Sequence, residues 1–291
     1  MVHWLTAQAG SEVSVDIAKR VPREIANAHT IFNVLNTVIL IGFATPMAKL
    51  SRWAIKDQPI KQGSLLEAKY LDDSLISTPA LALDRARLEI GRMGERLIEM
   101  VGIAGHLISE ESEQDSITLR TLDDEVDSLY LQITSYLGRV SSGQMTGEEV
   151  KTSQLFLAAA SALENLGDQI DLRFGVDFAE RSRLMLDFSP QTRNLLKDLI
   201  LSVIPNLELT LKALDEGDVE LAQRIRLSKA QLKSSVEKLR VHLMSRLAES
   251  SGERARVFGL ETEVVEAAKR LNDISRRIAK LVIARYEAPK G

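Results

Sequence analysis

The sequence contains no cysteine and few aromatic residues, and both absences narrow the classes of protein it can represent. Without cysteine there is no disulfide framework, no thiolate zinc site and no thiol nucleophile. Aromatic residues make up only 4% of the 291 residues, whereas charged residues make up 27%. Such a composition, dominated by Ala, Leu, Glu, Lys and Arg, is typical of helical bundles. We therefore expect an all-α protein.

A clustered basic stretch and a catalytic signature are missing as well. The net charge of -4 and the sequence pI near 5.7 argue against nucleic acid as a partner. The sequence has no phosphate loop of the form GxxxxGK[ST] and no nucleophile elbow, and its four histidines lie far apart without ligand spacing. We therefore expect a non-enzymatic protein that does not bind nucleic acid.

One long apolar segment, Ile31 to Leu50, carries no charge until Lys49 and has basic residues on both sides. It is about as long as a helix that crosses a bilayer, and it begins too far along the chain for a signal peptide. We interpret it as a transmembrane or membrane-proximal helix. Asn33 and Asn36 would then require partner helices, because polar groups at bilayer depth face protein or water. A buried core helix is the alternative.

Amphipathic helical periods recur after a linker at residues 57–69. Thr146 followed by Glu149 predicts a capping box, and Ser189 before Pro190 predicts a helix start. The six expected helices cover about residues 79–109, 115–140, 146–178, 190–215, 218–250 and 253–286. Short connections favour antiparallel neighbours. We therefore predict two successive three-helix bundles.

These elements divide the chain into an N-terminal segment (1–56), the linker (57–69), a first bundle (70–188) and a second bundle (189–291). The order of three helices followed by three more indicates an internal repeat of roughly a hundred residues. Identity between the two halves is slight.

Two pairs of carboxylates stand out on the expected helices of the first bundle. Asp123 and Asp127 lie four residues apart, as do Glu164 and Asp168, so each pair occupies one helical face beside an apolar stripe. If the helices are neighbours, the pairs can converge, and unpaired they would repel one another on leaving water. A cation is the natural partner, and oxygen ligands suit magnesium, calcium, manganese or iron.

A plainer reading is that both pairs lie on solvated helix faces, neutralised by Arg120 or Arg173. Gly167, inside the second pair, is unusual for a helix interior because glycine costs about 1 kcal/mol relative to alanine. A close helix approach or a site that needs room would explain it. Spacing alone favours the solvated-face reading.

The second half lacks these carboxylates. Lys229 and Lys233 stand about where Asp123 and Asp127 would fall, while Asn272 and Arg276 replace the second acidic pair. We expect no cation site there. Surface lysines are the simple explanation, and a basic pocket for an anion such as phosphate is the alternative.

The acidic helices carry a resemblance to a known family. ALENLGDQI is similar to the LERIGD signature of PhoU-like phosphate-regulatory proteins, and DDEVDSLY resembles their other acidic motif. In that family E/DxxxD motifs bind metal clusters. The resemblance therefore implies a divalent cation or iron held by the matching positions Asp123, Asp127, Glu164 and Asp168.

The apolar segment carries a second resemblance. IANAHTIFNVLNTVILIGF, at residues 25–43, is similar to the ANAHTLFN segment and last membrane helix of bacterial sodium/phosphate cotransporters of type II. Such transporters often carry a PhoU-like domain at the C-terminus, in this order. The similarity covers about residues 21–56 and 70–286. The inverted repeats with glutamine-serine motifs that build the transport site are absent from the sequence, and one span cannot form such a site.

Together these features predict part of a sodium-dependent phosphate cotransporter-like protein, whose PhoU-like domain regulates phosphate uptake. The expected location is the inner membrane with the helical domain in the cytoplasm. The expected partners are the membrane, a phosphate transporter subunit or phosphate-signalling protein, and a second copy of the chain. The alternative is a soluble, cytoplasmic PhoU-like metal-binding scaffold in phosphate signalling. A generic coiled-coil adaptor, the third reading, predicts no metal.

Overall fold

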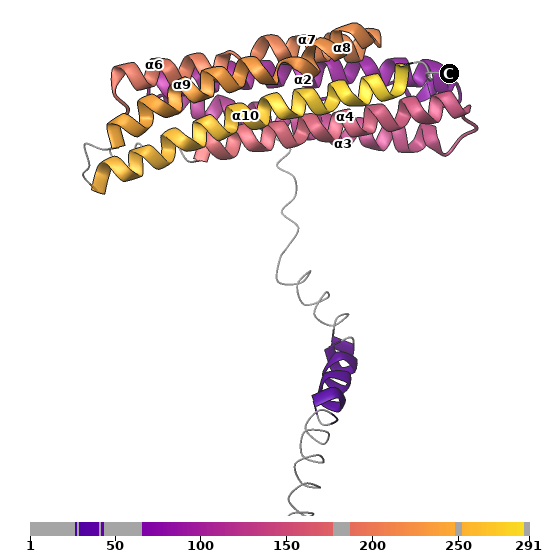
Figure 1. Ribbon diagram of the computed structural model, residues 1–291. Helices are drawn as coiled ribbons and strands as arrows, with labels where there is room; N and C mark the ends of the chain where they lie inside the picture. Colours follow the sequence, from indigo (N-terminus) through magenta and orange to yellow (C-terminus); the bar gives the residue numbers. More distant parts are fainter. Residues whose placement is uncertain are drawn as a thin grey trace, which may run out of the picture. The chain divides into compact units, whose positions relative to one another are not determined.

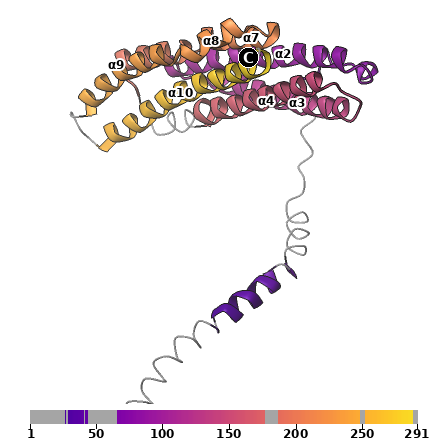
Figure 2. The ribbon, with the colours of Figure 1, turned by 45° about the vertical axis from the view of Figure 1, so that its right-hand side comes forward.

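The chain divides into two units, which we call the N-terminal unit (Met1–Gly63) and the helical unit (Ser64–Gly291). The computed structural model describes residues 27, 29–40, 42–43, 66–176, 187–247 and 252–287. All regular structure in these residues is helical, as the two views in Figures 1 and 2 show. The expectation of an all-α protein is confirmed for them.

The N-terminal unit contributes one helical stretch, residues 29–40. Its large apolar side chains, from Ile31 to Phe43, are between 54% and 64% exposed. Among the residues that can be described, no helix combines the length and the apolarity that a membrane crossing needs. The predicted span continues to Leu50, and its last part, residues 44–50, lies outside the described residues.

The first bundle is formed by three long antiparallel helices: α2 (Pro79–Ser109), α3 (Glu113–Ser141) and α4 (Gly147–Ile170). Thr146 caps α4 and Glu149 bonds back to its backbone N–H, which confirms the capping box. Below Ile170 the helix widens into a π-helical turn, η2 (Asp171–Val176). In the described residues, α4 therefore continues as irregular helix as far as Val176.

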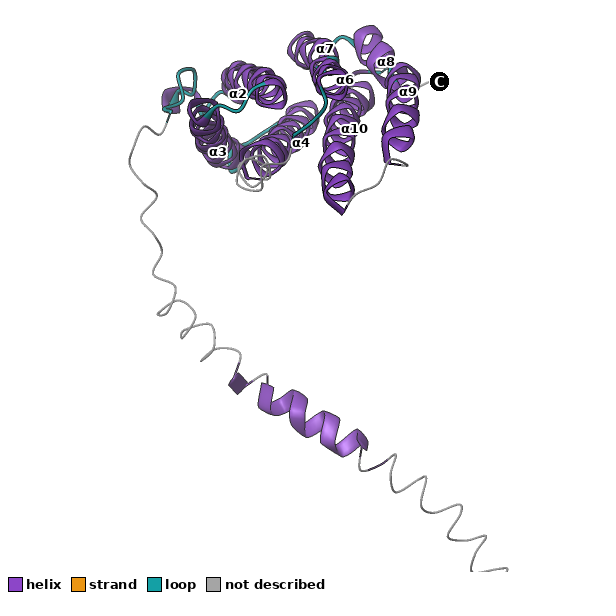
Figure 3. Cartoon of the chain, turned by 90° about the vertical axis from the view of Figure 1, so that its left-hand side faces the viewer, coloured by secondary structure: helices purple, strands orange, loops and turns teal. Residues whose placement is uncertain are grey.

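The second bundle contains α6 (Pro190–Leu201), α7 (Ile204–Glu216), α8 (Val219–Leu227), α9 (Lys229–Leu247) and α10 (Gly252–Tyr286). Ser189 caps α6 through its hydroxyl, as its place before Pro190 predicts. Gly217 ends α7 in the left-handed conformation, with φ of 66°, which glycine adopts without strain. Figure 3 shows these helices beside the first bundle, with α4 next to α10.

Two of the expected helices are each divided in the structure. The predicted helix at 190–215 breaks between α6 and α7, because Pro205 has no N–H to continue the hydrogen-bond ladder. The predicted helix at 218–250 breaks at Ser228, whose hydroxyl bonds back to the carbonyl of Ile225. Both breaks lie in the second bundle. Each of its first two expected helices is therefore replaced by two shorter ones, α6 with α7 and α8 with α9.

The two bundles pack side by side and share one continuous apolar core. On α2, glycine lets the second bundle approach closely: a Cβ on Gly94 would lie 2.3 Å from Leu211 Cδ2 of α7. A Cβ on Gly105 would lie 2.6 Å from Leu201 Cδ2 of α6. The helices α2, α4, α6, α7 and α10 therefore form one interface through the middle of the helical unit.

A strap at the start of the helical unit, residues 66–76, contains the short 3₁₀ helix η1 (Asp73–Leu75) and is bound to the first bundle by polar side chains. Glu89, fully buried on α2, accepts the backbone N–H groups of Lys69 and Tyr70 at 2.9 and 2.8 Å. Gln132 on α3 accepts the N–H of Ala68 and donates to the carbonyl of Leu66, both at 2.9 Å. These bonds satisfy backbone N–H and C=O groups that have no helical hydrogen-bond partner.

Candidate metal centre

Three acidic side chains of the first bundle meet between α3 and α4. Asp123 and Asp127 come from α3 and Asp168 comes from α4. Each offers one carboxylate oxygen, and the three oxygens lie within 4.8 Å of one another. Residues 45 positions apart in sequence are therefore brought together by the antiparallel packing of the two helices.

The carboxylates disfavour one another's charge. Burial, followed by the charges of Asp127, Asp171 and Asp168, raises the pKa of Asp123 to about 7. Burial and then Asp168 raise the pKa of Asp127. Near neutral pH, Asp123 is therefore either protonated or ionised. If it is ionised, its negative charge adds to that of the neighbouring carboxylates.

Gly167 provides the space that Asp123 occupies. A Cβ at position 167 would lie 2.9 Å from Asp123 Oδ1 and 3.3 Å from Val126 Cγ1. Asp123 Oδ1 is itself buried and has no hydrogen-bond partner among the described residues. A buried acceptor without a donor is costly, and a cation would satisfy it. Gly167 thus allows the carboxylate of Asp123 to pack close to the backbone of α4.

Glu164 lies near this group but outside the set of three. The charges of Asp168 and Asp127, after burial, raise the pKa of Glu164. Its carboxylate does not belong to the three whose oxygens converge. The structure therefore brings together three of the four predicted residues and leaves the fourth within electrostatic reach.

Two acidic residues that the sequence reasoning missed belong to the same surroundings. Asp124 and Asp171 both raise the pKa of Asp123, and burial raises the pKa of Asp171 itself. Asp171 lies seven residues after Glu164 and three after Asp168, so the heptad spacing was a usable signal. We call these six residues the carboxylate cluster: Asp123, Asp124, Asp127, Glu164, Asp168 and Asp171.

The arginines that might neutralise this cluster contribute unequally. The charge of Arg120 lowers the pKa of Asp171, although burial outweighs it and the pKa remains raised. Arg120 makes no hydrogen bond or ion pair with any described residue. Arg173 donates to Glu263 of α10 at 2.8 Å. Within the carboxylate cluster, the positive charge of Arg120 therefore acts mainly on Asp171.

The donor set fits a hard cation. It consists of carboxylate oxygens, the ligands of magnesium, calcium and manganese, and iron also accepts them. Asp123, Asp127 and Asp168 would hold such an ion, with Glu164 as the nearest additional carboxylate. The ion would supply the positive charge that permits these groups to ionise together.

In the second bundle, the positions matched to the two acidic pairs are occupied by a buried amide and by basic side chains. Asn272 is 2% exposed, and its carbonyl accepts from Asn206 Nδ2 at 3.0 Å and from the Ser228 hydroxyl at 3.3 Å. Lys229 and Lys233 are exposed. A buried amide network therefore stands where the first bundle has carboxylates.

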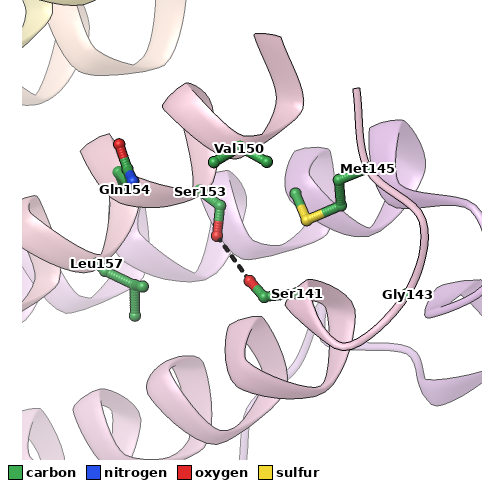
Figure 4. Close-up of a pocket in the computed structure, with 7 residues that line it drawn as sticks. All are labelled: Ser141, Gly143, Met145, Val150, Ser153, Gln154 and Leu157. Atoms are coloured by element: carbon green, nitrogen blue, oxygen red, sulfur yellow. Dashed lines mark hydrogen bonds between the residues drawn. The ribbon is translucent and has the colours of Figure 1, made fainter. Parts of the chain in front are cut away.

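A separate cavity of about 330 Å³ lies at the hairpin between α3 and α4 (Figure 4). Met145, Val150 and Leu157 supply its apolar wall, and the hydroxyls of Ser141 and Ser153 lie 3.3 Å apart across it. No charged residue lines this cavity. It is therefore chemically unlike the carboxylate cluster and contains none of its residues.

The fold of the helical unit is similar to that of PhoU proteins. Residues 90–171 match the family model of the PhoU domain, a range that includes all four predicted metal ligands. PhoU from Pseudomonas aeruginosa superposes with a TM-score of 0.64 at 16% identity, covering 70% of this chain and 96% of that one. The phosphate transport system regulatory protein PhoU from Streptococcus pneumoniae gives 0.62 at 11% identity, covering 72% and 97%. These likenesses establish the fold.

Curated relatives are longer than this chain. A proposed inorganic phosphate export protein of Salmonella typhimurium, YjbB, is 28% identical over 257 residues, which is 88% of this chain and 47% of that protein. YjbB of Escherichia coli is 26% identical over 264 residues, covering 90% and 48%. The chain thus spans about half the length of the curated relatives it matches.

Proposed function

We propose that this chain is the regulatory, non-catalytic part of a phosphate-transporting membrane protein. In this proposal the segment at Ile31 to Leu50 lies in the inner membrane and the helical unit regulates phosphate flux from the cytoplasmic side. The resemblance implies sodium-coupled phosphate uptake, whereas the name of the relatives gives phosphate export. In both cases the regulated process is the movement of phosphate across the membrane.

The observation that carries the proposal is the extent of the match to the phosphate export relatives. The helical unit, residues 64–291, contains 228 residues, whereas the matches extend over 257 and 264 residues. Each match must therefore include part of the N-terminal unit. The similarity to those proteins thus extends beyond the helical unit into the N-terminal unit, which supports the proposal.

The exposed N-terminal helix supports a membrane role. Its large apolar side chains, from Ile31 to Phe43, are exposed, and contiguous exposed apolar surface marks a site for a membrane or a partner. The side chains of Asn33 and Asn36 suit contacts with other helices of a transporter, where amides can be satisfied.

In this proposal the carboxylate cluster acts as a structural metal site that communicates with the strap. The helix α3 carries Asp123 and Asp127 and also Ser128 and Gln132, which bind the carbonyl of Leu66. Filling the cluster with a divalent cation or iron would stiffen α3 by removing charge repulsion. The strap would then be held more firmly on the first bundle.

Alkaline carbonate extraction of membranes tests the location. We expect the full chain to remain in the membrane pellet and a version that begins at Gln58 to be extracted. Extraction of both would favour the alternative, a soluble PhoU-like scaffold in phosphate signalling, and would overturn membrane anchoring.

Flux of radioactive phosphate in expressing cells tests the role. We expect the full chain to change uptake or release of phosphate, with and without sodium in the medium, and the Asp123→Asn/Asp127→Asn/Asp168→Asn variant to change it less. Equal flux in cells with the chain, with the variant and with neither would contradict the proposal. The sign of the change distinguishes uptake from export.

A further inference from the structure

A groove of about 370 Å³ lies between α4 and α10, where the two bundles meet. One wall is made by Asn165 and Gln169 of α4, and the other by residues of α10. Arg270 and Arg277 stand seven residues apart on α10, hence on one helical face, with Ile274 between them. We call this feature the arginine groove.

The two arginines of this groove are not neutralised by the described residues. Arg270 Nη1 donates to Gln169 Oε1 at 2.6 Å, which is a neutral partner. Arg277 makes no hydrogen bond or ion pair with any described residue. Asp273, the one acidic residue of the lining, pairs with Arg276 at 2.9 Å. The groove therefore keeps two guanidinium charges beside a carboxylate that is already engaged.

The polar groups around these charges suit an oxyanion. Guanidinium groups bind phosphate and carboxylate oxygens through paired N–H donors. Because Gln169 Oε1 accepts from Arg270, its amide nitrogen is left to donate, and Asn165 carries a second amide on the same wall. Ile274 supplies an apolar floor that excludes water from one side.

We propose that the arginine groove binds a phosphoryl group, either inorganic phosphate or a phosphomonoester. The choice of a phosphoryl ligand rests on the proposed function, whereas the uncompensated cationic groove does not. Because the ligand would contact α4 and α10 together, it would join the two bundles. It would also lie on α4, the helix that contributes Asp168 to the carboxylate cluster.

Isothermal titration calorimetry on the purified full chain tests this site at fixed ionic strength. We expect saturable binding of inorganic phosphate or of adenosine monophosphate, and the two titrations identify which source of the phosphoryl group the groove accepts. Arg270→Gln and Arg277→Gln should each weaken binding about tenfold, since a charge-assisted hydrogen bond is lost. The double variant should bind neither ligand.

Arg256→Gln is the matched control, because Arg256 is an exposed arginine on the same helix but does not line the groove. It should bind the ligand like the unaltered chain, and thermal unfolding should show that all variants are folded. Absence of saturable binding, binding unaffected by the groove variants, or equal weakening by Arg256→Gln would overturn the proposal. Calorimetry needs no membrane, so binding and phosphate flux can fail independently.

Discussion

The two bundles of the helical unit have related architecture but opposite charge. Residues 66–176 contain 20 acidic and nine basic residues, whereas residues 187–287 contain 15 acidic and 18 basic residues. In the first bundle the excess acid gathers in the carboxylate cluster between α3 and α4. In the second, the corresponding position of α10 is the buried amide of Asn272. The fold therefore does not require charge at this place.

This difference teaches how each bundle satisfies its buried polar groups. The second bundle does so internally, because Asn206 Nδ2 donates to the carbonyl of Asn272 and the Ser228 hydroxyl lies 3.3 Å from the same oxygen. The first leaves Asp123 Oδ1 without a donor among the described residues and raises the pKa of its neighbours. The carboxylate cluster is unfavourable without a ligand, whereas the second bundle satisfies its buried amide through its own hydrogen bonds. This difference is a reason to expect a ligand at the carboxylate cluster.

The largest expected effect is on cation binding. Asp123→Asn/Asp127→Asn/Asp168→Asn should lower the affinity for manganese or magnesium by at least about 100-fold, since even groups behind a metal ligand contribute about 10–100-fold. Calorimetric titration and elemental analysis of the purified chain measure it.

The control removes as many charges from the second bundle, by Asp198→Asn, Glu208→Gln and Glu220→Gln, which are exposed. That variant should bind the cation normally. Equal loss in both variants would show that net charge, and not the carboxylate cluster, attracts the ion.

A smaller effect is expected from opening the amide network of the second bundle. Asn272→Ala leaves the Nδ2 donor of Asn206 without its partner, while the Ser228 hydroxyl keeps its bond to the Ile225 carbonyl, and should lower the free energy of unfolding by about 2 kcal/mol. Urea unfolding measures this change. Asn194→Ala, at an exposed position of α6, is the matched control and should change it little. A loss below about 0.5 kcal/mol for Asn272→Ala would mean that water replaces the network.

The sequence predicted the fold of the first bundle better than that of the second. Thr146 with Glu149 marked the start of α4, because capping is a local interaction. The breaks near Pro205 and Ser228 were missed, since the amphipathic pattern continues across both. The sequence therefore predicted one helix where the structure has α8 and α9, separated at Ser228.

The candidate site was predictable only in part, because its local spacing can be read from the sequence but its packing cannot. Spacing placed Asp123 and Asp127 on one face, but only packing shows that Asp168 approaches them and that Glu164 does not belong to the converging group. Asp171 was missed because it lies outside the i, i+4 pairs: it follows Asp168 by three residues and Glu164 by seven. Metal binding itself stays a prediction.

The smallest expected effect is a dependence of stability on pH that Asp123 of the first bundle produces. The pKa of Asp123 is raised from 3.8 to about 7 in the folded chain, so the folded state binds more protons than the unfolded state between these values. The metal-free chain should therefore lose stability as pH rises from about 4 to 7 and lose no more above it.

Because Asp123 is partly exposed, we expect this loss to be on the order of 1 kcal/mol. Asp123→Asn should flatten the slope in urea unfolding measured across this range, whereas Asp198→Asn in the second bundle should leave it unchanged. A divalent cation should restore stability near pH 7, where Asp123 can ionise and bind it. An identical slope in the chain and in Asp123→Asn would show that the repulsion within the carboxylate cluster is relieved without a cation, and the first bundle would then need no ligand to match the second.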